Sequence, residues 1–312
     1  MPPWVLVLVL AVASSAQGVQ PSNFALQSTH TWRMNHTFMP GALPCPVINK
    51  PKDQPSWIPS TSFAASAAAI ATQYSKGALL VIGANEGKSD NDPSFQVFSS
   101  KNAAHMLKIF VEPIPWLFAQ LQNNVKNMTH ARAIQAAVAD RSGTMEMFCF
   151  AFDPKLGPPA VWPAELRMKA RTNSAKRDGR GWWTQICSLT RDRLFHQMDM
   201  GREFANAREV LAPYIKAEKV KVVTVDELLQ NIGKQHPVRH VQIDVEGFDD
   251  IVLKALPLGL ERNGLIFRPA SITFEHVVLD NTRVETACMW LNEKGYSTCR
   301  EGQNIVAIAL PH

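Results

Sequence analysis

Acidic and imidazole side chains follow two apolar stretches of the sequence, where they could carry acid–base chemistry. Asp244 and Glu246 come directly after the run 238–243, and Glu275 and His276 come after a second run. If both runs are parallel strands, their carboxyl ends meet at one edge of a sheet. There Asp244 would position a bound molecule, His276 or Glu246 would accept a proton, and Glu275 would hold a substrate. The structural alternatives are a helix cap at Asp244 and a packed strand-end position for His276.

A glycine loop and a strand-end acid indicate a ligand at the same edge. The loop is Gly83-Ala84-Asn85-Glu86-Gly87, and the acid is Glu112. The loop has neither the GxxxxGK[ST] pattern of a nucleoside-triphosphate site nor the three glycines with which GxGxxG holds a pyrophosphate. A nucleoside without phosphates needs one close backbone approach and an acid for its ribose hydroxyls. We therefore expect these residues to bind S-adenosylmethionine, with a tight strand-to-helix turn as the structural alternative.

Short apolar runs that alternate with helical patterns predict the elements that must position these side chains. The runs are continuous, as in strands buried on both faces of a parallel sheet. The expected strands are 78–82, 108–111, 134–139, 222–224, 238–243 and 271–274, with a further strand at 144–150 after a turn at 140–143. Helices are expected up to Tyr74 and over 116–121, 225–229, 247–256 and 282–291, with a closing hairpin over 296–299 and 305–310. This alternation predicts an α/β fold with a mostly parallel sheet and an antiparallel edge.

Composition divides the chain into three parts. An uncharged apolar run followed by small residues predicts a secretory signal peptide over 1–16, with an uncleaved anchor as the alternative. Seven prolines over 17–59 predict an extended stem or wrapping arm, and 60–312 then forms the globular domain. Sequons at Asn35 and Asn127 agree with a lumenal route. We therefore expect a location in the lumen of the endoplasmic reticulum or Golgi, or secretion, and no stable membrane span after cleavage.

The five cysteines cannot all pair with one another in an oxidising compartment. Cys149 lies in the apolar stretch MFCFAF and is expected to be a free core thiol. Cys288 and Cys299 could bridge a late helix to the following strand. No two cysteines have the CxxC spacing of a zinc or redox site. Although carboxylates cluster at two strand ends, no ligand spacing calls for a metal ion.

Six blocks together resemble the FkbM-type S-adenosylmethionine-dependent methyltransferases over roughly residues 78–310. They are VIGANEG, FVEPIPWLFAQLQNN, AVADRSGTMEMF, VVTVDELL, VRHVQIDVEGFDDIVLKAL and GYSTC. The resemblance implies the class I methyltransferase fold, which is Rossmann-like, with a mostly parallel seven-stranded sheet and one antiparallel edge strand. It also implies O-methyl transfer, often to sugar hydroxyls, and a contact between Asp140 and the adenine amino group. Asp140 fits a simple Asp-Arg-Ser-Gly turn equally well.

The segment 153–221 is longer than this family needs and is expected to be an irregular insertion that caps the acceptor site. It carries 14 basic and 7 acidic residues between Lys155 and Lys221, a net charge of +7 against +5 for the whole chain. Trp182 and Trp183 could stack on sugar rings, and Arg180 could bind a carboxylate or sulfate. We therefore expect a glycan or glycoconjugate acceptor that carries acidic groups. A solvated loop pinned by its tryptophans is the alternative.

Three other functions stay open on the sequence alone. A protein of this fold could have lost catalysis and bind glycans or proteins through its surface. A nicotinamide-dependent oxidoreductase would need a third glycine in its loop. Methylation of nucleic acid would suit the basic charge but not the expected lumenal location. The reading that accounts for most residues is an O-methyltransferase that acts on sugar hydroxyls and not on nucleic acid.

Overall fold

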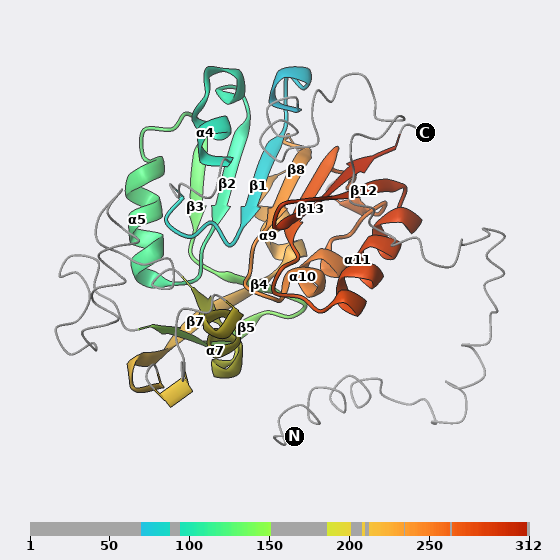
Figure 1. Ribbon diagram of the computed structural model, residues 1–312. Helices are drawn as coiled ribbons and strands as arrows, with labels where there is room; N and C mark the ends of the chain where they lie inside the picture. The colour runs from blue at the N-terminus through green and yellow to red at the C-terminus, as the bar shows by residue number, and fades with distance from the viewer. Residues whose placement is uncertain are drawn as a thin grey trace, which may run out of the picture. The chain divides into compact units, whose positions relative to one another are not determined.

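The computed structural model describes residues 70–87, 94–150, 186–200, 208–209, 212–233, 235–262 and 264–310. Its main element is a seven-stranded sheet with the order β12-β13-β11-β8-β1-β2-β3 (Figure 1). The strands are β1 (Ala78–Ile82), β2 (Leu107–Val111), β3 (Ala131–Ile134), β8 (Val238–Ile243), β11 (Ser271–Glu275), β12 (Tyr296–Glu301) and β13 (Asn304–Ala309). These bounds confirm the apolar strands predicted at 78–82, 108–111, 238–243 and 271–274 and the closing hairpin.

The strand order places a topological switch point in the middle of the sheet. From β1 the chain moves outward through β2 and β3, and it later returns to pair β8 with the other side of β1. These strands and β11 are parallel, whereas β13 runs antiparallel to both β11 and β12. The antiparallel pairing therefore lies at one edge of the sheet, where the reversed strand β13 is second from the end and β12 is last. This is the Rossmann-like class I methyltransferase architecture, in which ligands bind where the strand order reverses.

Alternate strand residues pack against helices on opposite faces of the sheet. Leu79, Val81 and Phe110 face α4 (Ser94–Ser99) and α5 (Pro115–Val125). Leu80, Ile82 and Ile109 face the other helices. These are α9 (Val225–Ile232), α10 (Asp249–Ala255) and α11 (Asn281–Glu293), and Figure 1 draws α10 and α11 across the sheet from α5. Because both faces are covered, the strands are rich in apolar residues, although Lys108, His240 and Gln242 are also buried in them.

A second sheet lies beyond the carboxyl ends of the main strands. Its order is β4-β7-β5-β6, and the strands are β4 (Ala137–Ala139), β5 (Gly143–Phe150), β6 (Cys187–Ser188) and β7 (Ile215–Thr224). The remaining elements are α7 (Arg191–Met200), the 3-10 turns η1 (Lys101–Ala103) and η3 (Ala212–Tyr214), and the hairpin β9 (Glu261–Arg262) and β10 (Leu265–Ile266).

Two predicted boundaries are wrong, and the second sheet explains both. The strand expected over 134–139 is split, because β3 ends at Ile134 in the main sheet and β4 begins at Ala137 in the second. The irregular segment was expected to continue to Lys221, yet β7 already begins at Ile215 and pairs with β5 over eight positions. In the second half of β7, exposed Lys219 and Lys221 alternate with buried Val220 and Val222, because one face of this strand is exposed.

Both cysteine predictions are also wrong. Cys149 forms a disulfide with Cys187, its register partner across β5 and β6, and is not a free thiol. Cys299 is a buried free thiol, and Cys288 is disulfide-bonded but not to Cys299. A free thiol therefore remains, as the odd count predicts.

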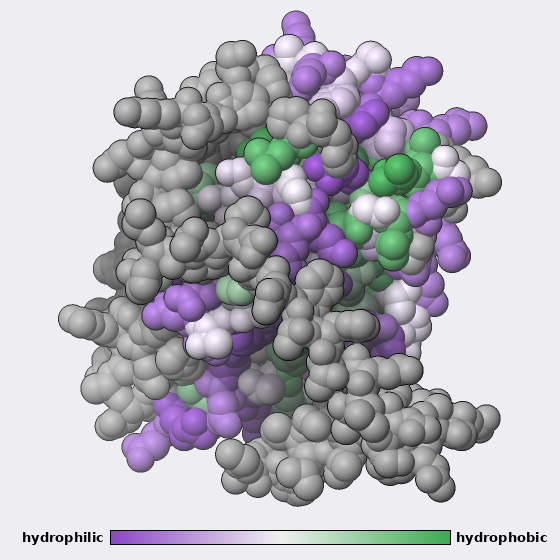
Figure 2. Space-filling model, turned by 90° about the vertical axis from the view of Figure 1, so that its right-hand side faces the viewer, coloured by the Kyte–Doolittle hydropathy of each residue, from purple (hydrophilic) through white to green (hydrophobic). Residues whose placement is uncertain are grey.

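Several predicted features lie outside the described residues. They are the signal peptide, the Pro-rich arm and the acceptor residues Arg180, Trp182 and Trp183. Within the described ranges, no helix combines the length and apolar character needed to cross a bilayer. Figure 2 shows that hydrophilic residues cover much of the described surface on one side, with hydrophobic residues in smaller groups between them.

Candidate functional site

A cleft opens at the switch point, where the ends of β1, β2 and β8 meet the second sheet. Its empty space, counted together with the open solvent at its mouth, is about 710 Å³. One wall is polar and includes Asn85, Glu112, Asp244 and Glu246. The other is apolar and includes Ile114, Leu117, Val138, Met145 and Met147. With Gly83, which also lines the cleft, the structure thus brings together five of the predicted site residues at a place suited to a ligand with a polar and an apolar end.

The glycine loop follows β1 and is tied to the end of β2. Gly83 has φ +83°, and a Cβ built there would lie 1.7 Å from the carbonyl oxygen of Asp244. A Cβ on Gly87, with φ +71°, would meet Leu121 Cδ1 at 2.5 Å. Both glycines are therefore required by packing within the protein, which agrees with the tight-turn alternative. Gly83 and Asn85 line the cleft, whereas Glu86 and Gly87 are not among its lining residues.

Glu112 holds this loop while it faces the cleft. Its Oε2 accepts the backbone N–H of Asn85 at 2.8 Å, and its Oε1 accepts that of Ile114 at 2.9 Å. The side chain is only 4% exposed. Burial, with a smaller contribution from the charge of Glu246, raises the pKa of Glu112 to about 7. Each oxygen keeps one lone pair, so the carboxyl group can still accept two hydroxyl donors from a ligand.

The loop after β8 carries Asp244 and Glu246 into the cleft and is held by Asp249. The Asp249 side chain accepts the backbone N–H of Val245 at 3.3 Å and that of Gly247 at 2.9 Å. Asp249 is fully buried, and burial raises its pKa to about 6. Glu246 lies in the chain between Val245 and Gly247, whose amides Asp249 binds, and it has the unusual left-handed φ of +55°. Such a conformation persists only where surrounding contacts enforce it, and it often marks a functional position.

Two arginines hold the same loop from the other side. Arg193 of α7 donates to the carbonyl oxygen of Gly247 at 3.2 Å and also to that of Val278. Arg283 of α11 donates to the Gly247 carbonyl at 2.9 Å and forms an ion pair with Asp250. Neither arginine was predicted from the sequence, because both are far from Gly247 along the chain. Asp249 was also missed, although an acid just after a glycine turn at a strand end is a local signal for this role.

The capping role considered for Asp244 is wrong. Helix α10 begins at Asp249 and not at Gly247, its N-cap residue is Phe248, and no side chain caps it there. The half-buried Asp244 instead lines the cleft beside Gly83. Its position at the end of β8 is therefore compatible with the predicted role in orienting a ligand.

Glu275 and His276 lie at the neighbouring strand end but are not among the residues that line the cleft. Burial, together with the charges of Glu246 and Asp249, raises the pKa of Glu275 to about 8. The ring Nε2 of His276 lies 3.2 Å from the carbonyl oxygen of Gly302, toward the β12–β13 turn. Burial lowers the pKa of His276. This geometry favours the packed strand-end position for His276 and leaves Glu246 as the better placed base.

Asp140 lies in the exposed turn between β4 and β5 and is not a lining residue of the cleft. The residues just before it, Ala136, Ala137 and Val138, do line the cleft. The chain after β3 therefore contributes an apolar surface, while Asp140 keeps the position of a turn residue.

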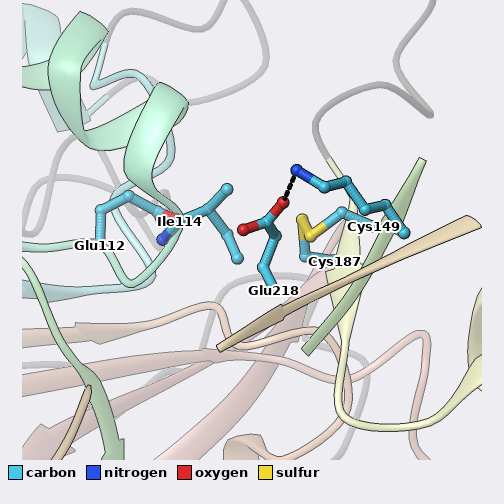
Figure 3. Close-up of a disulfide and its surroundings, with 6 residues drawn as sticks. Glu112, Ile114, Cys149, Cys187 and Glu218 are labelled. Carbon is cyan, nitrogen blue, oxygen red and sulfur yellow. Dashed lines mark hydrogen bonds and ion pairs between the residues drawn. A yellow bond between two sulfur atoms is a disulfide. The ribbon is translucent and has the colours of Figure 1, made fainter. Parts of the chain in front are cut away.

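A disulfide supports the apolar wall. Cys187 lines the cleft, and Cys149 packs with it in a small core that includes Ile114 and Met147. Figure 3 shows Ile114 between Glu112 on one side and Glu218 with the disulfide on the other. Lys216 forms an ion pair with Glu218 at 2.5 Å, also drawn in Figure 3. The bridge thus connects β5 to the segment that leads into α7 and its Arg193.

In the described part of the chain, no group of three or more histidine, cysteine, aspartate or glutamate side chains is arranged to hold a metal ion. The Glu112 carboxyl group instead accepts backbone amides, as does that of Asp249 beside the cleft.

Comparison with known proteins gives only distant likenesses. No protein-family model matches the chain, and no curated protein matches it. Among solved structures, a fibrillarin pre-rRNA processing protein of Methanococcus jannaschii is similar, with a TM-score of 0.35 and 12% identity over 81% of this chain and 76% of that chain. A precorrin-6y C5,15-methyltransferase of Geobacter metallireducens has a TM-score of 0.36 and 12% identity over 85% of this chain and 100% of that chain. Similarity at this level carries no evidence of activity, so the function rests on the residues of the cleft.

Proposed function

We propose that this protein is an S-adenosylmethionine-dependent methyltransferase that transfers a methyl group to a hydroxyl oxygen. The observation that carries the proposal is the buried Glu112 carboxyl group, which faces a cleft at the switch point of a Rossmann-like sheet. A strand-end acid in this position suits the paired hydroxyls of a ribose. The resemblance of the sequence to FkbM-type methyltransferases supports the same donor.

The residues of the cleft fit S-adenosylmethionine by their chemistry. Glu112 keeps lone pairs for the ribose hydroxyls after it has accepted two backbone amides. The apolar wall of Leu117, Val138 and Met147 suits a purine ring. Asp244 and Glu246 place carboxyl groups on the polar wall, where they would attract a cationic sulfonium and amino group. The loop offers no cradle of glycine amides for a pyrophosphate, which disfavours a dinucleotide.

The carboxyl groups after β8 would act on the acceptor. The bound donor would supply a methyl group already activated as a sulfonium, so the protein has to orient a hydroxyl and remove its proton. Glu246, held in a left-handed conformation, is the best placed proton acceptor, and Asp244 orients the reacting groups. As the new carbon–oxygen bond forms and the carbon–sulfur bond breaks, the hydroxyl proton passes to the carboxylate.

We further propose a sugar hydroxyl of a glycan or glycoconjugate as the acceptor, and the secretory pathway as the location. The FkbM resemblance supports the acceptor class. The apolar run before residue 17 and two sequons support the location. The Cys149–Cys187 disulfide is typical of proteins from oxidising compartments and agrees with that location.

Calorimetric titration with S-adenosylmethionine and its demethylated product tests donor binding. Transfer of labelled methyl to a panel of glycans, with products mapped by mass spectrometry, then tests the reaction and identifies the oxygen. Donor binding and label on a sugar oxygen are expected. Glycan binding without donor binding would instead favour a catalytically inactive binding protein, and binding of NAD in place of the donor would favour an oxidoreductase.

A further inference from the structure

A second recess lies directly beside the cleft, on the other side of the loop after β8. It encloses about 520 Å³ of empty space, part of it open, and is lined by Thr190, Arg193, Gly247, Phe248, Asp250, Ile251 and Arg283. Phe248 lines both this recess and the cleft. Gly247 of the recess follows Glu246 of the cleft in the chain, so their Cα atoms are about 3.8 Å apart. One molecule of modest size could therefore reach both.

Both arginines of the recess keep donors that the described part of the protein does not use. Arg193 donates through one terminal nitrogen, Nη2, to two carbonyl oxygens. Arg283 donates through Nε and Nη2 to Asp250 and Gly247. Among the described residues, the Nη1 group of each arginine has no hydrogen-bond acceptor, and neither Nη1 is a buried unpaired atom. Each arginine can thus still donate to a ligand in the recess.

The charges of the recess are not balanced by its own acid. Asp250 forms ion pairs with Arg283 and, at 3.6 Å, with Lys254. Arg193 forms no ion pair with a carboxylate among the described residues, since its partners are carbonyl oxygens. Burial and the neighbouring charge of Arg283 lower the pKa of Arg193, and the smaller contributions of Asp249, Asp250 and Glu246 oppose them. An oxyanion between the two guanidinium groups would relieve this repulsion and accept from both, as carboxylates and sulfates do.

We propose that the recess between Arg193 and Arg283 binds an oxyanion, a carboxylate or sulfate, of the same acceptor molecule whose hydroxyl enters the cleft. This inference rests on the proposed function, because it needs the acceptor to occupy the cleft. In this proposal, Arg193 and Arg283 are the residues that give the protein its preference for an acidic acceptor. The anionic group anchors the sugar on one side of Gly247, and the hydroxyl meets Glu246 on the other.

Glucuronate is the probe, and glucose is its neutral counterpart. Both are titrated at constant ionic strength, with and without the demethylated donor product. We expect glucuronate to bind at least about tenfold more tightly than glucose, because a charge-assisted hydrogen bond contributes about that factor or more. Binding should weaken as salt is raised. Equal affinity for the two sugars would overturn the proposal.

Ile251→Glu and Leu265→Glu form a matched pair of variants. Both side chains are 40% exposed, but only Ile251 lines the recess. Neither residue holds the loop, so both variants should fold, as checked by circular dichroism. We expect Ile251→Glu to weaken glucuronate binding about tenfold through repulsion and to leave glucose binding unchanged. Leu265→Glu should leave both unchanged. An equal effect of the two variants would contradict the proposal.

Arg193→Gln and inorganic sulfate complete the test. Arg193→Gln should weaken glucuronate binding by about tenfold or more. If sulfate displaces glucuronate only weakly, the sugar ring contributes to binding and the acceptor assignment holds. If sulfate binds as tightly as glucuronate, the recess is a site for free anions and the assignment fails. Failure of the demethylated donor product to bind the wild-type protein, with glucuronate binding intact, would sink the proposed function but not the oxyanion site.

Discussion

The Glu112 carboxyl group accepts the backbone N–H of Asn85 across the ends of β1 and β2, at 2.8 Å. This contact fixes the glycine loop and aims the same carboxyl group at the cleft. One side chain thereby has a structural and a proposed ligand-binding role. The two roles can be separated by experiment, because they respond differently to substitution.

Replacement of Glu112 should weaken donor binding. Glu112→Ala removes acceptors for the ribose hydroxyls and leaves the amides of Asn85 and Ile114 without their partner. The loss should be about 1.5–3 kcal/mol of binding free energy, measured by calorimetry with the demethylated donor product. Glu146→Ala, at an exposed position of β5, is the control and should bind normally. Unchanged affinity in a folded Glu112→Ala protein would remove Glu112 from the donor site.

Catalysis should depend on the two carboxyl groups after β8. Asp244→Asn and Glu246→Gln keep the side-chain size but remove the charge, so each should lower kcat about a hundredfold or more. Donor affinity should change much less, since Glu112 on the polar wall and Leu117 on the apolar wall are intact. His276→Gln is the comparison and should retain activity, because His276 does not line the cleft. A large loss in His276→Gln with near-normal Glu246→Gln turnover would reverse this assignment.

Stability should fall as pH rises from 6.5 to 8 because of Glu275. Its folded-state pKa is raised to about 8 from an ordinary value of 4.5. In this window the carboxyl group is ionised in the unfolded chain but largely protonated in the folded one. Unfolding therefore releases a proton, and higher pH favours it. The buried His240, with its pKa lowered from 6.5 to about 3, stays neutral in the folded protein. It opposes the trend near pH 6.5, where it is still partly protonated in the unfolded chain, and this contribution fades toward pH 8.

The contribution of Glu275 is at most about 2 kcal/mol across this window. Glu275→Gln should make the free energy of unfolding, measured with urea, less dependent on pH. Glu293→Gln, at an exposed position of α11, should keep the wild-type dependence. Parallel curves for wild type and Glu275→Gln would show that Glu275 has an ordinary pKa.

Loss of the Cys149–Cys187 disulfide should affect both stability and the cleft. The bridge closes a loop between residues 38 apart, so its removal should cost roughly 2–4 kcal/mol of stability. Because Cys187 lines the cleft, the Cys149→Ser/Cys187→Ser variant should also bind donor more weakly. Cys299→Ala removes a free thiol and keeps this bridge, so donor binding should be normal. If the double variant binds donor normally, the disulfide contributes to stability alone.

The sequence by itself determined the main sheet and the place of the cleft. Short runs rich in apolar residues predicted β1, β2, β8 and β11, because strands buried on both faces carry apolar side chains at most positions. The polar residues that end these runs predicted Glu112, Asp244 and Glu246, since the carboxyl ends of parallel strands converge on one edge. Local chemistry was sufficient here because strand and functional residue are adjacent in the chain.

Only the tertiary structure decided which residues hold and complete the site. The end of β7 was predicted at 222–224, but residues 215–221 were missed because their exposed lysines resemble a loop until β5 is paired with them. Arg193 and Arg283 reach Gly247 from 54 and 36 residues away, and Cys149 meets Cys187 across a sheet that no local pattern predicts. The spacing of apolar residues along a segment indicates whether the segment buries one face or two. It does not report which distant segment supplies the contact, because that depends on how the whole chain packs.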